Sequence, residues 1–89
     1  MKMILAILTN EKTDMVTSGL MEAGYRVTKL ASTAGFLSSG TTTLMIGVND
    51  ADLNSALDII RGYYAPYEEG ENIQATIFVL NVKNFERIQ

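Results

Sequence analysis

The sequence contains no cysteine, no histidine and no tryptophan, and it has a single proline. Without cysteine there is neither a disulfide framework nor a thiolate nucleophile. The lack of histidine as well removes the commonest zinc ligands and general bases. Only carboxylates and lysines remain for catalysis, and the carboxylates lie at the starts and faces of the expected helices and in a late loop. We therefore expect a protein that is not an enzyme and that carries no metal or cofactor.

Positive charge and long apolar runs are also scarce. Seven Lys and Arg residues stand against ten Asp and Glu residues, which gives a formal charge of −3. Such a chain lacks the dominant basic surface that sequence-independent binding to nucleic acid or anionic lipid requires. No stretch approaches the roughly 20 apolar residues of a membrane span, and the opening MKMILAIL lacks the long apolar core and cleavage site of a signal peptide. We expect a cytoplasmic protein without nucleic-acid partners or membrane insertion.

The 89 residues, of which 47% are apolar, predict one compact domain spanning 1–89. Periodicity predicts six elements in chain order: a strand over 1–8, a helix over 11–23, strands over 25–32 and 41–48, a helix that starts at Asn49 or Asp50 and closes at Gly62, and a strand over 73–82. We expect Thr9 or Asn10 to cap the first helix and Gly24 to end it.

The order βαββαβ in so short a chain predicts a ferredoxin-like α+β fold, a four-stranded antiparallel sheet with two helices on one face. The first and last strands are apolar at both parities, so both faces of the sheet should leave water, although two helices cover only one. We therefore expect a homo-oligomer that packs through its sheets.

Residues 25–48 contain no Asp or Glu, although the chain as a whole is acidic. Arg26 and Thr28 share a parity on the expected second strand, so they can converge on a phosphate, Arg through forked charged donors and Thr through a hydroxyl. A surface charge beside a routine strand threonine explains the same pattern equally well. The spacing alone leaves both interpretations open.

The loop over 33–40 places two large apolar side chains in a polar setting. One interpretation is that this part of the loop, Gly35, Phe36 and Leu37, folds back on the core or on the next subunit. The other is that it packs against a flat aromatic ligand, with backbone amides that hydrogen-bond to the edge of the ligand. Thr41, at the exit of the loop, is the hydroxyl that we expect to face a ligand. Gly47 in the following strand marks either a bulge or a close approach by another group.

The segments MKMILAI and YRVTKLASTAGFLSSGTTTLMIGVND resemble the family of PII-like cyclic di-AMP receptors called PstA or DarA, over roughly the first 50 residues without a gap. The resemblance implies a ferredoxin-like PII-type homotrimer that binds cyclic di-AMP in the clefts between subunits. It further implies that Arg26 and Thr28 approach phosphate and ribose, and that the residues Gly35, Phe36 and Leu37 hold an adenine. Gly47 would line the same cleft.

The chain departs from this family at four places: Ala34 stands where Gly is frequent, Ser38 where a basic residue is common, and the other two are Thr41 and the late loop. Thr41 replaces an asparagine whose amide can both donate to and accept from adenine, and YYAPYEEGEN, over 63–72, is shorter than the family's usual loop and carries three Glu. Negative charge near a dianionic ligand weakens binding. The alternative is therefore a PII-like interaction module that meets a protein target through this late loop and no longer binds cyclic di-AMP, or that binds another nucleotide such as ATP or ADP.

Overall fold

The structure is a computed structural model that describes residues 1–33, 40–64 and 74–88. Its elements follow the predicted order: β1 (Lys2–Thr9), α1 (Asn10–Glu22), β2 (Val27–Ser32), β3 (Thr41–Val48), a short 3₁₀ turn η1 (Asp50–Asp52), α2 (Leu53–Arg61) and β4 (Ala75–Asn81). Gly35, Phe36, Leu37 and most of the late loop lie outside the described residues.

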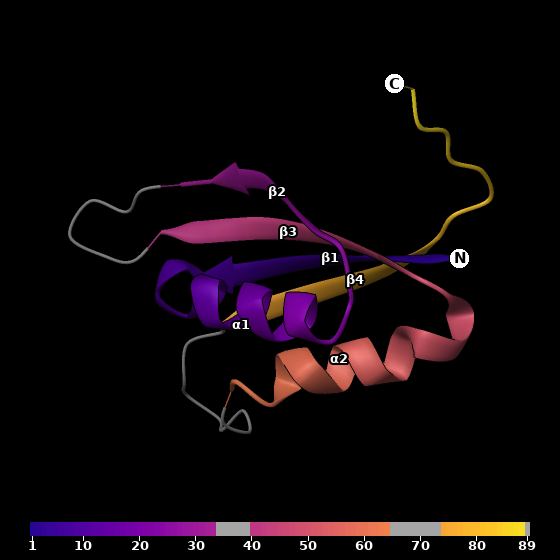
Figure 1. The fold of residues 1–89 in the computed structure, drawn as a ribbon. Coiled ribbons are helices and arrows are strands. Elements are labelled where there is room, and N and C mark those ends of the chain that lie inside the picture. Colours follow the sequence, from indigo (N-terminus) through magenta and orange to yellow (C-terminus); the bar gives the residue numbers. More distant parts are fainter. Residues whose placement is uncertain (34–39, 65–73, 89) are drawn as a thin grey trace.

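The four strands form one sheet in the order β2-β3-β1-β4, and each neighbouring pair is antiparallel. Both helices lie on the same side of this sheet (Figure 1). The predicted α+β ferredoxin-like arrangement is thereby confirmed. The first strand is central, as its apolar residues at both parities predicted.

The core lies between the sheet and the two helices, and every second residue of β1 and β3 points into it. Its fully or nearly fully buried members are Ile4, Ala6, Leu8, Val16, Leu20, Leu44, Ile46, Val48, Ala56, Leu57 and Ile60. The members on α2 recur at three- and four-residue spacing, which places them on one face of the helix. The apolar face of α2 is therefore the side that packs against the sheet.

The opposite face of the sheet, here called the open face, is apolar and has no covering helix among the described residues. Leu5 of β1 lies between Met45 of β3 and Phe78 of β4, and in the next row Met3 pairs with Leu80. Phe78 and Leu80 expose 52% and 44% of their surface. Apart from the C-terminal tail at one end, the described residues leave this face uncovered in the single chain, so its burial in an oligomer stays a prediction.

The helix ends and strand irregularities differ in detail from the sequence predictions. Thr9 occupies the N-cap position of α1, but its side chain makes no capping hydrogen bond; instead the hydroxyl of Thr13 donates to the carbonyl of Thr9 at 3.1 Å. Gly24, at φ 93°, follows the helix in the left-handed region, as predicted. The bulge lies in β2 between Lys29 and Ala31 and not at Gly47, which stays in regular register.

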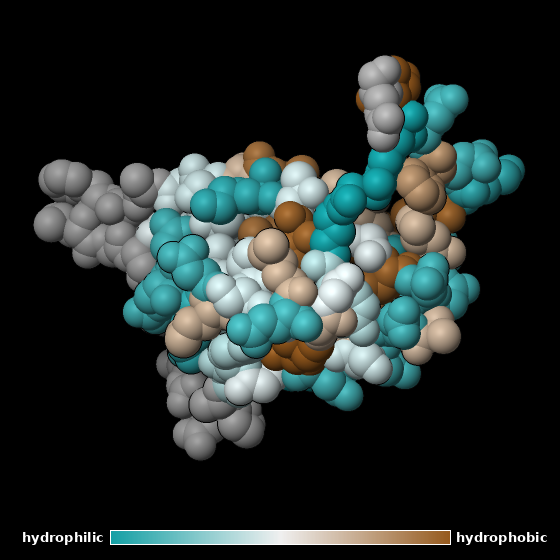
Figure 2. All heavy atoms as spheres, in the orientation of Figure 1, coloured by the Kyte–Doolittle hydropathy of each residue, from teal (hydrophilic) through white to brown (hydrophobic). Residues whose placement is uncertain are grey.

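Figure 2 shows the molecule from the same side, with hydrophobic atoms in small groups among hydrophilic ones and with the C-terminal tail standing out from the body. Within the described part of the chain, no helix is both long enough and apolar enough to cross a membrane.

Candidate functional site

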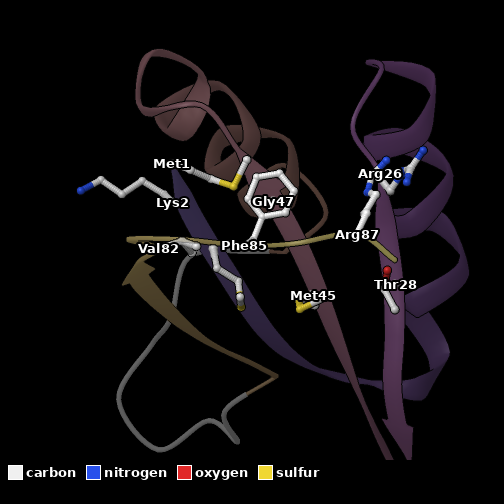
Figure 3. Close-up of a pocket in the computed structure, with 10 residues that line it drawn as sticks. Met1, Lys2, Arg26, Thr28, Met45, Gly47, Val82, Phe85 and Arg87 are labelled. Atoms are coloured by element: carbon white, nitrogen blue, oxygen red, sulfur yellow. The ribbon is translucent and has the colours of Figure 1, made fainter. Parts of the chain in front are cut away.

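The open face carries a pocket of about 310 Å³ at the end of the sheet where the chain begins. We call it the tail pocket, because the C-terminal tail forms one of its walls. Its lining residues are Met1, Lys2, Met3, Arg26, Thr28, Met45, Gly47, Val82, Phe85 and Arg87 (Figure 3). The volume lies at the lower end of the range for small-molecule sites.

Strand register explains why residues far apart in sequence meet here. Gly47 pairs with Met3, and Thr28 pairs with Met45, so all four belong to the open face. The tail reaches this place because the backbone N–H of Val82 donates to the carbonyl of Met1 at 3.0 Å. That bond continues the pairing of β4 with β1 to the very start of the chain.

Three of the seven Lys and Arg residues line the tail pocket, and no Asp or Glu is among its described lining residues. Arg26 and Arg87 lie on the same side of the view in Figure 3, whereas Lys2 extends away from the other labelled side chains, and its ammonium group donates to the side-chain oxygen of Asn81. Two guanidinium groups without a neighbouring carboxylate attract an anion, and their forked donors suit phosphate oxygens.

The remainder of the tail pocket is apolar. Methionine side chains and the ring of Phe85 supply polarizable surface of the kind on which a flat aromatic group packs. Gly47 leaves room there, because a Cβ added to it would meet no atom within 4 Å. A ligand with an anionic part and a flat apolar part fits this combination. Elsewhere in the described residues, no group of three or more Asp and Glu side chains could hold a metal ion.

Thr41, another predicted site residue, lies at the other end of the sheet, in a group of residues around the ends of the segment 34–39. The backbone N–H of Thr33 donates to the carbonyl of Thr41 at 2.8 Å, and the N–H of Thr41 donates to the hydroxyl of Thr33 at 3.0 Å. The two hydroxyl oxygens are 3.3 Å apart. We call this arrangement the loop base; it consists of Asn10, Thr33, Gly40, Thr41 and Thr42.

The structure thus divides the predicted site residues between two places. Arg26, Thr28 and Gly47 meet at the tail pocket, and Thr41 lies at the loop base. Thr41 and Gly47 are six positions apart on β3, which corresponds to about 20 Å along a strand. The residues Gly35, Phe36 and Leu37 lie outside the described part of the chain, so the role expected for them stays a prediction.

Comparison with known proteins gives these two places a context. The sequence profile of the cyclic-di-AMP receptor family matches residues 1–69. This chain belongs to the cyclic-di-AMP receptor family. Among solved structures it is similar to a functionally unknown protein from Pediococcus pentosaceus, with 34% identity, a TM-score of 0.76, and coverage of 98% of this chain and 96% of that one. The two chains therefore have nearly the same length.

Phe85 and Arg87, which line the tail pocket, were not among the candidates that the sequence suggested. Because residues 82–88 form no strand, the two-residue spacing of Phe85 and Arg87 does not place their side chains on one face, and it gave no signal for this pocket. What the sequence lacked was the position of the tail, which depends on β4 lying beside β1.

The start of the late loop is held against α1. The ammonium group of Lys12 donates to the carbonyl of Tyr63 at 2.9 Å and lies 4.9 Å from the centre of the Tyr64 ring. The Tyr63 ring packs so closely on Gly19 that a Cβ there would come within 2.3 Å of the hydroxyl oxygen. Burial, and then the charge of Glu11, raise the pKa of Tyr64 above its ordinary value. These two tyrosines are packing residues of the helical layer.

Proposed function

We propose that this protein is a non-enzymatic, single-domain signalling protein of the cytoplasm that binds cyclic di-AMP in the clefts between the subunits of a homotrimer. The observation that carries the proposal is the tail pocket, which combines two guanidinium groups, apolar surface and no described carboxylate. Family membership supports a nucleotide as the ligand. A target protein would respond to whether the site holds a ligand; these residues do not identify that target.

In this proposal Arg26 and Arg87 bind the phosphates, and Thr28 binds a phosphate or ribose oxygen. Calorimetry with cyclic di-AMP, cyclic di-GMP, ATP and ADP tests the ligand. We expect Arg26→Ala to weaken binding of cyclic di-AMP at least about tenfold, which corresponds to about 1.4 kcal/mol. Arg61→Ala on α2 is the matched control, since Arg61 is exposed, pairs with Asp58 and lies outside the pocket.

Two outcomes would contradict this assignment. If none of the four nucleotides bound at about 100 μM, a concentration that detects even weak complexes, the ligand class would be wrong. If Arg26→Ala and Arg61→Ala bound cyclic di-AMP equally well, Arg26 would not take part in phosphate binding.

The division of the site residues favours a cleft between two subunits. About 20 Å separate Gly47 from Thr41 along β3. A ligand that contacts both a tail pocket and a loop base must therefore contact the tail pocket of one chain and the loop base of another. The tail pocket also lies on the open face, where Phe78 and Leu80 are half exposed and Ile88 of the tail is 90% exposed. Packing of neighbouring subunits on this face would cover the apolar surface and complete the pocket.

The oligomer is tested by sedimentation at micromolar concentration. We expect the wild-type chain to sediment as a trimer and Phe78→Asp to sediment as a monomer, because an uncompensated carboxylate is costly in an apolar interface. Asp58→Ala on α2 is a surface control that should remain trimeric. A monomeric wild-type protein would remove both the trimer and the inter-subunit site.

One observation favours a second candidate function. The backbone N–H and hydroxyl of Thr41 are both engaged with Thr33, so Thr41 offers less to a ligand than an exposed amide would. A PII-like interaction module without cyclic di-AMP, or with ATP or ADP, would keep the same fold. Since Tyr63 and Tyr64 are held on α1, its partner surface would centre on residues 65–72. A partner captured equally by the wild type and by Phe36→Ala, but lost on Tyr67→Ala, would support this function over the first.

A further inference from the structure

Three of the five methionines of the chain line the tail pocket: Met1, Met3 and Met45. The other two, Met15 and Met21, lie exposed on α1 and are not among the residues that line it. Because the chain has no cysteine, its thioethers are the sulfur groups that a peroxide can oxidise. Oxidation of this protein therefore changes the lining of the tail pocket, and the two methionines of α1 serve as an internal comparison.

Strand pairing fixes Met3 and Met45 in the part of the tail pocket that the sheet forms. Met3 of β1 pairs with Gly47, and Met45 of β3 pairs with Thr28. Both methionine side chains are half-buried, whereas Met1, at the end of the chain, exposes 44% of its surface. Since two strands hold Met3 and Met45 in place, a chemical change at either side chain stays in the pocket.

The tail pocket has room for a small oxidant. Its volume is about 310 Å³, and a Cβ added to Gly47, one of its lining residues, would meet no atom within 4 Å. Figure 3 shows Met45 among the labelled side chains around this space. A site that admits a nucleotide from solvent also admits a peroxide, because a peroxide is far smaller.

The reaction with hydrogen peroxide is the transfer of one oxygen atom to the thioether. A bond forms between the sulfur and one peroxide oxygen, the O–O bond breaks, and the sulfur loses two electrons. The second oxygen takes up the proton of the transferred one and leaves as water. The product is a sulfoxide, which is polar and can be reduced again by methionine sulfoxide reductases.

A sulfoxide in the tail pocket interferes with both parts of the expected ligand. Its oxygen accepts hydrogen bonds, so it competes with phosphate oxygens for the forked donors of Arg26 and Arg87, which line the same pocket. It also replaces apolar, polarizable surface on which a flat group would pack.

We propose that Met3 and Met45 form an oxidation-sensitive site in the ligand pocket, and that their conversion to sulfoxides by peroxide weakens nucleotide binding. A bound nucleotide covers the two sulfur atoms and slows their oxidation. Reduction of the sulfoxides restores binding. This inference rests on the proposed function, because its effect on affinity needs a ligand in the tail pocket.

Calorimetry with cyclic di-AMP, before and after treatment with hydrogen peroxide, is the first test. We expect the treatment to lower the affinity of the wild type at least about tenfold, the size expected when a polar group enters an apolar contact. Treatment with methionine sulfoxide reductases should restore it. The treated protein should keep the circular dichroism spectrum of the untreated one, since loss of binding through unfolding would overturn the assignment to the pocket.

Two double variants separate the pocket methionines from the others. In Met3→Leu/Met45→Leu, peroxide should change the affinity by less than about twofold relative to the same variant before treatment, because leucine has a similar volume and no sulfur. Met15→Leu/Met21→Leu is the matched control and should lose as much affinity on treatment as the wild type. Equal losses in the two double variants would overturn the proposal.

Peptide mass spectrometry follows each methionine separately. Saturation with cyclic di-AMP should slow the oxidation of Met3 and Met45 and leave that of Met15 and Met21 unchanged. Equal rates at Met3 and Met45 with and without bound ligand would overturn their place in the ligand pocket. If the untreated wild type binds cyclic di-AMP and the treated protein binds it equally well, the oxidation-sensitive site fails alone; if the untreated wild type binds no nucleotide, the proposed function fails and this inference fails with it.

Discussion

The two ends of the sheet differ in how their polar groups are paired. At the loop base, hydroxyl, amide and backbone groups bond to one another, and Gly40 has no room for a side chain. At the tail pocket, no described Asp or Glu is among the residues that line it with Arg26 and Arg87, and Gly47 faces open space. Groups that satisfy one another build structure, whereas groups left without a complement are available to a ligand. The same strand, β3, serves both ends.

Gly40, which directly precedes β3, and Gly47 within β3 provide the largest expected contrast. Gly40→Ala should lower the free energy of unfolding by about 3 kcal/mol, because the new Cβ would collide with backbone that cannot move aside cheaply. Gly47→Ala should change it by less than about 0.5 kcal/mol, since open space surrounds this position. Denaturant unfolding at one fixed protein concentration measures both. Equal losses would mean that the two ends do not differ as described.

Arg87→Ala tests the tail as a wall of the pocket. Cyclic di-AMP affinity should fall about tenfold, or about 1.4 kcal/mol, as for a lost phosphate contact. Lys83→Ala, in the same tail but outside the pocket lining, removes the same charge and should have a smaller effect. The loss of affinity in Arg87→Lys should lie between those of Arg87→Ala and Lys83→Ala, because an ammonium group keeps the charge but lacks the forked donors of a guanidinium group. A loss as large for Lys83→Ala would indicate general charge attraction in place of a specific contact.

The smallest effect is expected for Tyr64→Phe, away from both ends. The buried hydroxyl of Tyr64 has no hydrogen-bond partner among the described residues, so its removal should raise the free energy of unfolding by up to about 1 kcal/mol. Because burial raises the pKa of Tyr64 in the folded state, the unfolded chain ionises first. The wild type should therefore lose stability as the pH rises above 10.0, and the difference between variant and wild type should widen there. A constant difference across that pH range would contradict the buried environment.

Much of the fold could be read from periodicity, and some of the site could not. The alternating and helical patterns predicted the order of elements and the central place of β1. The parity of Arg26 and Thr28 left a shared site and a routine surface pair equally open, and the structure shows that both line one pocket. For Gly47 the sequence left open a bulge or a close approach by another group, and the bulge occurs instead between Lys29 and Ala31, because the register of an edge strand depends on its partner. Asn10 was expected only as a candidate helix cap, since Thr33 and Thr42, to which its side chain bonds, become its neighbours only through strand pairing.

The sequence by itself determined which residues are apolar, which are charged and how often each recurs, and these local properties specify the strands, the helices and the membership in a receptor family. The tertiary structure decided which of them meet. Arg87 lies some 60 positions after Arg26, and it reaches the same pocket because β4 pairs with β1 and brings the tail back to Met1. Thr41 lies six residues from Gly47, yet the extended strand holds them at opposite ends of the sheet. Separation along the chain and separation in space are set by different physics, the first by covalent bonds and the second by the pairing of strands.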